Sequence, residues 1–285
     1  MSDCIHDVIM RTIENLDKLK QASQNTQNQN DVLKTDFRML EFYSGELCVL
    51  SSKPGMGKSA FVLSLIKQLA IDKKRSVGFI NPGSFDDITF GKRLLSMCSG
   101  VDTAKIRVGM LNPSDVNKVE TTAKKLYDST IEYFNEPNCS YSSTEEAIKN
   151  MVNKHHTKLI IVEGFDFLQE LVDAEKEDYR DTLEHLLWSF NCLATELAVA
   201  IMLVIDLPEP VSDILSEPSL LDFKKYMIIP TFANKVVFVH RDRLCRTKTP
   251  FKDAQLIIAK NEFGPTGETS MKFDNRTCLF FEEKM

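Results

Sequence analysis

The sequence lacks a long apolar run and any cysteine pattern typical of a metal site. Of its 285 residues 43% are hydrophobic, yet no run reaches the roughly 18 apolar residues that a membrane-spanning helix needs. Its 7 cysteines include no C-x-x-C pair and stand at no metal-ligand spacing with a histidine. These absences argue against a membrane protein and a zinc protein, and they fit reduced thiols inside a cell.

The chain also lacks an excess of positive charge. Lys and Arg number 35 against 41 Asp and Glu, which gives a formal net charge of -6. A protein that grips nucleic-acid phosphates over its whole surface is usually basic, so any contact with nucleic acid has to be local. The first residues, MSDCIHDVIM, show no signal-peptide or transit-peptide pattern. We therefore expect a cytoplasmic protein that does not contact a membrane.

The first 30 residues form a separate unit of the sequence. Residues 21–30, QASQNTQNQN, are polar and aperiodic, which is typical of a flexible linker. Before this linker, apolar side chains recur at helical spacing, at Ile5, Val8, Ile9, Ile13, Leu16 and Leu19. Such a helix has to bury its apolar stripe on its own domain or on a neighbour. The pattern predicts an amphipathic helix with a polar linker in residues 1–30 and a globular domain in residues 31–285.

From about residue 45 short apolar strands alternate with helices. This alternation predicts an α/β fold, with a mostly parallel sheet covered by helices on both faces. The expected strands are residues 46–51, 76–81, 130–134, 158–163, 199–205, 235–240, 255–260 and 277–281. The expected helices are residues 58–70, 88–99, 114–129, 143–156 and 179–197, the fourth opening with capping-box spacing at Ser143. The last strands follow one another without helices, which predicts antiparallel strands at the end of the sheet.

The most informative segment runs from Leu47 to Ser59. An apolar strand leads into a turn, then Gly-Lys-Ser, then an apolar helix, which is the context of a Walker A phosphate loop. Backbone N–H groups of such a loop cradle phosphates, and the helix N-terminus adds a positive dipole. We expect ATP with Mg²⁺ here, Lys58 on the β- and γ-phosphates and the Ser59 hydroxyl on the metal. Ser52 replaces the usual first glycine, and the other expected nucleotide contacts are Lys53, Pro54, Gly55, Met56 and Gly57.

A Walker B acid is expected at the end of a later apolar strand. Leu159-Ile-Ile-Val-Glu163 supplies one, so Glu163 is our candidate for a second Mg²⁺ ligand and, with Lys58, for a catalytic residue. Aspartate is commoner at this place, and a longer carboxylate meets the tight octahedral geometry of Mg²⁺ less well. Asp166 is the alternative, although no buried strand directly precedes it.

These motifs resemble the C-terminal, RecA-like motor domain of DnaB-type replicative DNA helicases. The segment Ser52-Lys-Pro-Gly-Met-Gly-Lys-Ser59 is similar to that family's Walker A loop, which also lacks the first glycine. Similar segments follow in order at residues 101–109, 194–199, 233–242 and 260–273. The resemblance covers about residues 35–282, and residues 4–34 resemble the family's linker helix, which packs on the adjacent subunit of a hexameric ring. The family's separate N-terminal helical domain has no counterpart.

The resemblance implies a RecA-like P-loop NTPase that moves along single-stranded DNA inside a hexamer. It also implies a nucleotide contact by Lys260. Yet the family's water-polarising Glu has no match in Asn81-Pro-Gly-Ser-Phe85. The family's Ser-Gln after the strand at 199–205 is replaced here by Ile205-Asp206. The arginine-finger position holds Glu262, whose carboxylate would repel a γ-phosphate that an arginine stabilises. The candidates for replacing the missing acid are Asp86, Asp87 and Asp206.

The segments that contact DNA in the family have changed as well. Residues 206–219 contain no Lys or Arg, although phosphate binding gains affinity when basic side chains release counterions. The stretch carries instead Asp206, Glu209, Asp213 and Glu217. Basic candidates for phosphate contact remain at Lys224, Lys225, Arg241, Arg243, Arg246 and Lys248.

Two functions fit these residues. One is a ring-forming, ATP-dependent DNA helicase of DNA replication with weak hydrolysis, whose partners are further copies of the chain. The other is a non-hydrolysing ATP-binding paralogue that regulates or assembles with a replicative helicase. The phosphate loop and the amphipathic helix fit both. The unmatched catalytic positions favour the second, because loss of one electrostatic catalytic group commonly costs about 10²–10³ in rate.

Overall fold

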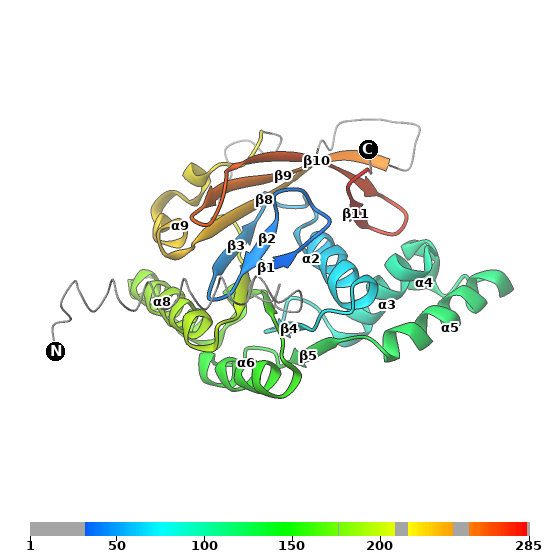
Figure 1. Cartoon of the computed structure of the whole chain (residues 1–285), viewed down its shortest axis with the longest axis horizontal. Coiled ribbons are helices and arrows are strands. Elements are labelled where there is room, and N and C mark those ends of the chain that lie inside the picture. The colour runs from blue at the N-terminus through cyan, green and yellow to red at the C-terminus, as the bar shows by residue number, and fades with distance from the viewer. Residues whose placement is uncertain (1–31, 176, 209–215, 242–250, 284–285) are drawn as a thin grey trace, which may run out of the picture.

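A sheet of nine strands runs through the domain in the computed structural model, which describes residues 32–175, 177–208, 216–241 and 251–283. Helices lie on both sides of this sheet (Figure 1). The helix expected in residues 4–20 and the linker expected in residues 21–30 lie outside the described residues. So do Arg243, Arg246 and Lys248 of the basic cluster.

The sheet has a parallel part and an antiparallel part. Its strand order is β11-β10-β9-β8-β3-β7-β6-β4-β5. The pairs among β8, β3, β7, β6, β4 and β5 are parallel, and those among β8, β9, β10 and β11 are antiparallel. The strands are β3 (Leu47–Ser51), β4 (Val77–Asn81), β5 (Ile131–Asn135), β6 (Leu159–Glu163), β7 (Ala200–Val204), β8 (Lys235–Arg241), β9 (Phe251–Asn261), β10 (Gly267–Asp274) and β11 (Leu279–Phe281). The predicted α/β class, with antiparallel strands at its end, is confirmed.

Five longer helices occupy the places predicted for them. They are α2 (Lys58–Ile66), α3 (Asp87–Ser99), α5 (Pro113–Tyr127), α6 (Tyr141–His155) and α8 (Tyr179–Leu197), and α2 continues as a π-helical turn, η1 (Lys67–Asp72). Shorter elements not predicted from the sequence are β1 (Val32–Lys34), β2 (Glu41–Tyr43), α4 (Thr103–Val108), η2 (Phe165–Phe167), α7 (Gln169–Asp173), η3 (Leu220–Tyr226) and α9 (Ile228–Phe232). Strands β1 and β2 pair with each other in a separate sheet.

The capping box expected at Ser143 is wrong. Helix α6 begins at Tyr141, and the hydroxyl oxygen of Ser140 accepts a hydrogen bond from the Ser143 backbone N–H at 3.2 Å. Ser143 therefore lies inside the first turn. A side-chain oxygen that reaches an N–H three residues ahead caps a helix, and Ser140 is the serine placed to do so.

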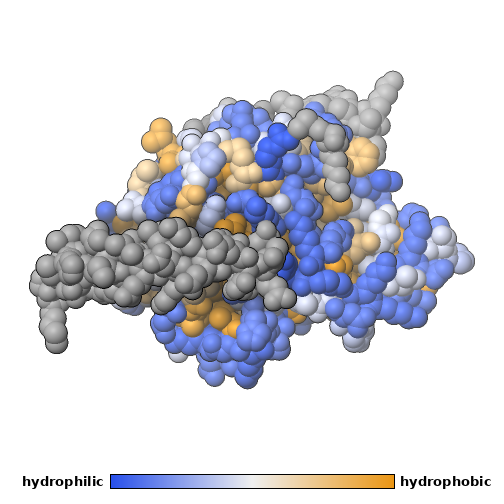
Figure 2. All heavy atoms as spheres, in the orientation of Figure 1, coloured by the Kyte–Doolittle hydropathy of each residue, from blue (hydrophilic) through white to orange (hydrophobic). Residues whose placement is uncertain are grey.

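Each face of the sheet has its own apolar core. Along β3, Cys48 and Leu50 point into the core that contains α2 and α3, and Leu47 and Val49 point into the core that contains α6 and α8. Successive strand residues point to opposite faces, so a strand buried on both sides reads as a continuous apolar run. The visible face of the molecule outside these cores is mostly hydrophilic, with scattered apolar side chains (Figure 2).

The parallel strands bring distant segments to one edge of the sheet. Strands β3, β7 and β6 are neighbours and run in the same direction, so their carboxyl ends meet. The loop that follows β3, the last residue of β6 and the segment after β7 are thereby placed together. No helix among the described residues is long and apolar enough to cross a membrane.

Candidate functional site

The loop between β3 and α2 depends on two glycines. Gly55 and Gly57 have φ angles of 74° and 99°, in a left-handed region that disfavours other residues. A Cβ atom on Gly57 would also lie 3.1 Å from the Phe280 ring. Ser52 is not among the residues with positive φ, and its hydroxyl donates to the Lys53 carbonyl at 3.1 Å. The first glycine of the usual motif is therefore dispensable here.

A buried carboxylate faces the helix end of this loop. The Ser59 hydroxyl donates a hydrogen bond to Glu163 Oε1 at 2.6 Å, and Glu163 is only 2% exposed. Its other oxygen, Oε2, is buried and has no hydrogen-bond partner among the described residues. Burial raises the pKa of Glu163, while the Ser59 hydrogen bond and the Lys58 charge lower it. A hydroxyl beside a carboxylate with an unsatisfied oxygen is a donor set that fits Mg²⁺.

A second carboxylate contacts the loop lysine directly. Lys58 Nζ forms an ion pair with Asp206 Oδ1, in the segment after β7. The Asp206 backbone N–H donates to Asp166 Oδ2 at 3.0 Å. Burial is the main cause that raises the pKa of Asp166 to about 6. Asp166, the alternative to Glu163, thus positions the Asp206 backbone, whereas Glu163 accepts from Ser59.

The other two candidate acids are engaged elsewhere. Asp86 caps α3 by accepting the Thr89 N–H at 2.8 Å. Asp87 accepts from the Tyr133 hydroxyl at 2.7 Å and from Asn135 Nδ2 at 2.5 Å. Neither side chain lines the cavity at the loop. Of the three acids considered from the sequence, the fold brings only Asp206 to Lys58.

The loop opens on a cationic cavity of about 600 Å³. Among the described residues its lining includes six cationic residues and one acidic residue, which are Lys53, Lys58, Lys92, Arg93, Arg107, Arg241 and Asp206. The Lys53 side chain is itself buried, and its ammonium donates to the Ser216 hydroxyl at 2.5 Å. Arg241 donates to the Gly55 carbonyl at 2.9 Å and lies 4.0 Å from the centre of the Phe273 ring. Positive charge in a cleft attracts anionic ligands, so this cavity suits a polyphosphate.

The fold brings most residues of the predicted loop to the cavity and adds cations that the sequence did not indicate. Lys53, Pro54, Gly55, Gly57, Lys58 and Ser59 line the cavity, whereas Met56 is buried beneath the loop. The cations Lys92, Arg93 and Arg107 come from α3 and α4. No spacing links them to the loop, so only the fold reveals them.

Lys260 does not belong to this chain's own phosphate site. Its ammonium donates to the carbonyls of Pro230 and Ala233 at 3.0 and 2.7 Å and pairs with Glu262 at 2.8 Å. In the register of the sheet, Lys260 of β9 lies opposite Val236, close to the start of β8. Strand β8 runs parallel to β3. The phosphate loop follows the opposite end of β3. A Lys260 contact to the nucleotide of another subunit stays a prediction.

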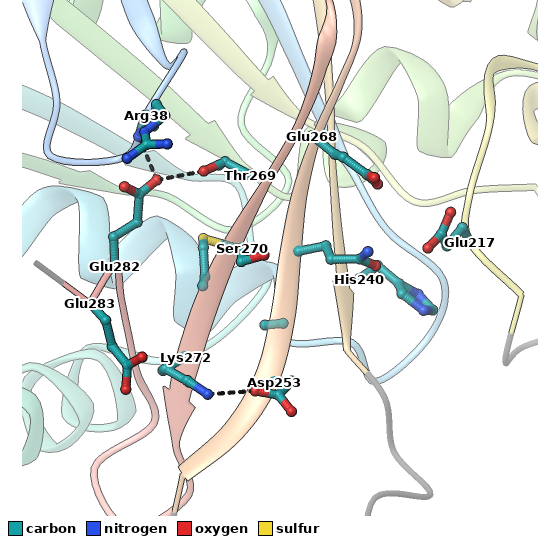
Figure 3. Close-up of a pocket in the computed structure, with 13 residues that line it drawn as sticks. Arg38, Glu217, His240, Asp253, Glu268, Thr269, Ser270, Lys272, Glu282 and Glu283 are labelled. Carbon is teal, nitrogen blue, oxygen red and sulfur yellow. Dashed lines mark hydrogen bonds and ion pairs between the residues drawn. The ribbon is translucent and has the colours of Figure 1, made fainter. Parts of the chain in front are cut away.

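A larger cavity of about 890 Å³ lies across β9 and β10 (Figure 3). Of the described residues, five acidic ones line it, together with the basic residues Arg38, His240 and Lys272. Glu282 accepts from Thr269 at 3.1 Å, and Lys272 pairs with Asp253 at 2.7 Å. The excess of carboxylates makes this cavity unsuitable for phosphates despite its size.

The loop, its cationic cavity and the buried acid at the end of a parallel strand define a P-loop nucleotide-binding protein of the α/β class. The family described as DnaB-like helicase C terminal domain matches residues 31–282, so the chain belongs to the DnaB-like helicase C-terminal domain family.

Individual relatives agree with this assignment. Replicative DNA helicase DnaB of Rickettsia prowazekii is 26% identical over 306 residues, covering 94% of this chain and 61% of that protein. The same helicase of Treponema pallidum is 27% identical over 233 residues, covering 81% and 50%. The chain thus spans half to three fifths of the length of these relatives.

The solved structure of a DnaB-like replicative helicase has a TM-score of 0.79 at 18% identity, covering 97% of this chain and 71% of the other. A solved ATPase domain reaches 0.80 at 17%, with full coverage of both chains. These two likenesses show the RecA-like ATPase fold.

Proposed function

We propose that this chain is an ATP-binding protein of DNA replication that binds Mg²⁺·ATP at the loop of residues 52–59. The observation that carries the proposal is the cationic cavity beside the hydrogen-bonded pair of Ser59 and the buried Glu163. Lys58 binds the β- and γ-phosphates, and Ser59 and Glu163 hold the metal, which neutralises phosphate charge. The unsatisfied Glu163 oxygen supports this assignment.

The family activity is ATP-dependent DNA unwinding by a ring helicase, and we propose that hydrolysis in this chain is weak. Asp86 and Asp87 are held by Thr89, Tyr133 and Asn135, so neither reaches a nucleotide in the cavity. Glu262 is fixed by Lys260 and Asn234, and the Lys260 hydrogen bond lowers the pKa of its carboxyl group. A carboxylate at that position supplies none of the transition-state stabilisation that an arginine gives.

The alternative is a non-hydrolysing paralogue that regulates or assembles with a replicative helicase. Either function uses association with further subunits, through the amphipathic stripe of residues 4–20 and the end of β9, where Lys260 and Glu262 lie. Single-stranded DNA is the family substrate, and Lys224 and Lys225 are the described residues that we assign to phosphate contact. One structural relative is a DnaB-like helicase whose interactions with primase were studied, which makes a primase a further partner to test.

Replacing Lys58 with Ala tests the nucleotide site. We expect Mg²⁺·ATP affinity to fall roughly tenfold to 150-fold, because hydrogen bonds to a charged group contribute about 1.5–3 kcal/mol. Isothermal titration calorimetry on the full chain measures this loss. Lys272→Ala, which removes an exposed lysine paired with Asp253, is the matched control and should bind as the unmodified chain does. Equal ATP affinity in the Lys58 and Lys272 variants would refute the proposed site.

A further inference from the structure

We infer that Asp206 makes the site prefer a nucleoside diphosphate over a nucleoside triphosphate, by holding Lys58 where a γ-phosphate would bind. This inference rests on the proposed nucleotide site and adds a residue that sets its specificity. It concerns the identity of the bound nucleotide rather than the rate of hydrolysis.

The geometry places the Asp206 carboxylate on the phosphate-binding ammonium. Lys58 and Asp206 form an ion pair, with side-chain exposures of 14% and 76%. The backbone of Asp206 is fixed by its N–H bond to Asp166 Oδ2 at 3.0 Å. Both residues line the same cavity. The pair is therefore held from the protein side and remains open toward the cavity.

The charges in the cavity make Asp206 unlike every other described residue of its lining. Asp206 is the one acid among the described lining residues, beside the cations Lys58, Lys92, Arg93, Arg107 and Arg241, whereas the buried Lys53 ammonium donates to Ser216. A diphosphate fills the backbone cradle of a Walker A loop, while the third phosphate extends past the loop toward the lysine. That third phosphate adds a negative charge, meets the Asp206 carboxylate and competes with it for Lys58. Like charges at short range oppose binding.

Because the Asp206 carboxylate competes with the third phosphate for Lys58, a neutral side chain at this position should change the selectivity between diphosphate and triphosphate. Asn at position 206 keeps the size of the side chain and the backbone N–H to Asp166, and it removes the charge. Lys58 then binds the γ-phosphate without competition from a carboxylate. The expected gain in triphosphate affinity is moderate because Asp206 is largely exposed and water screens its charge.

The test compares the affinities of Mg²⁺·ADP and of the Mg²⁺ complex of a β,γ-imido ATP analogue, by calorimetry on the full chain. For Asp206→Asn we expect triphosphate affinity to rise about three- to tenfold, and diphosphate affinity to change by less than about twofold. Asp206→Gln is a second variant with a neutral side chain. Asp253→Asn, which breaks the exposed ion pair with Lys272, is the control and should leave both affinities unchanged.

The ratio of the two affinities is the readout, because a purely structural role of Asp206 would weaken both nucleotides together. An unchanged ratio in both Asp206 variants, with both nucleotides still bound, would overturn this inference and leave the proposed site standing. No binding of either nucleotide to the unmodified chain would overturn the proposed site and the inference with it.

Discussion

The Glu163→Gln protein is expected to be more stable than the unmodified chain and to lose the benefit of Mg²⁺ for ATP binding. Burial raises the pKa of Glu163, and its Oε2 atom lacks a hydrogen-bond partner among the described residues. Burying a charge costs free energy, and Gln removes the charge while its Oε1 still accepts from Ser59. Calorimetric melting and ATP titrations with Mg²⁺ or with a chelator measure the two effects.

The gain in stability should depend on pH in a defined direction. Because the pKa of Glu163 is raised in the folded state, protonation favours folding, and the unmodified chain loses this contribution as pH rises through the folded-state pKa. Gln at this position does not titrate. The difference in melting temperature should therefore be small near pH 4.5 and largest in neutral and alkaline solution. A destabilised variant at pH 8, or one whose ATP affinity still rises with Mg²⁺, would contradict the assignment of Glu163.

Removing Lys235 is expected to cost about 3–5 kcal/mol of unfolding free energy, because it leaves a buried charge without its partner. Lys235 Nζ lies 2.7 Å from Glu46 Oε1, and both side chains are fully buried. The ammonium also donates to the Glu41 carbonyl and lies 5.4 Å from the centre of the Tyr43 ring. Urea unfolding of Lys235→Ala measures the loss.

An exposed pair of the same chemistry supplies the control. Lys272 and Asp253 are also 2.7 Å apart, but their side chains are 31% and 65% exposed. Lys272→Ala should cost less than about 1 kcal/mol, as exposed ion pairs usually do. Equal losses of unfolding free energy in Lys235→Ala and Lys272→Ala would show that burial does not decide the strength of the Lys235–Glu46 pair. The double change Lys235→Met with Glu46→Gln should recover much of the loss, because no unpaired charge remains.

The parallel strands and the phosphate loop were predictable because each has a strong local signal. Strands buried on both faces read as apolar runs, and the Gly-Lys-Ser segment stands between such a strand and a helix. The short helices α4, α7 and α9 and the three-residue strands β1 and β2 span too few residues for a periodic pattern to emerge. Strand β10 was not predicted either, because only two of its buried residues, Met271 and Phe273, are apolar, while the buried Thr269 and Asp274 are polar.

The surroundings of the loop depend on tertiary contacts that no spacing encodes. Asp206 was recognised as a replaced position, but its ion pair with Lys58 follows from the adjacency of β3 and β7. Arg107 reaches the cavity from α4, an element that the sequence did not predict. Asp86 and Asp87 looked equivalent to Asp206 in the sequence, and only their contacts in the fold separate them.

Steady-state ATP hydrolysis by the full chain, with and without single-stranded DNA and with Lys58→Ala as the blank, tests the proposed function most directly. We expect turnover above the blank but below about 1 s⁻¹, the lower end of typical enzymes, because Asp206 is the one acid among the described residues that line the cavity and Glu163 holds Mg²⁺ in the proposed site. Turnover equal to the blank, with ATP still bound, would replace this proposal by the non-hydrolysing alternative. Fast turnover that rises further with DNA would contradict weak hydrolysis and would require a catalytic acid and an arginine finger from elsewhere in the assembly.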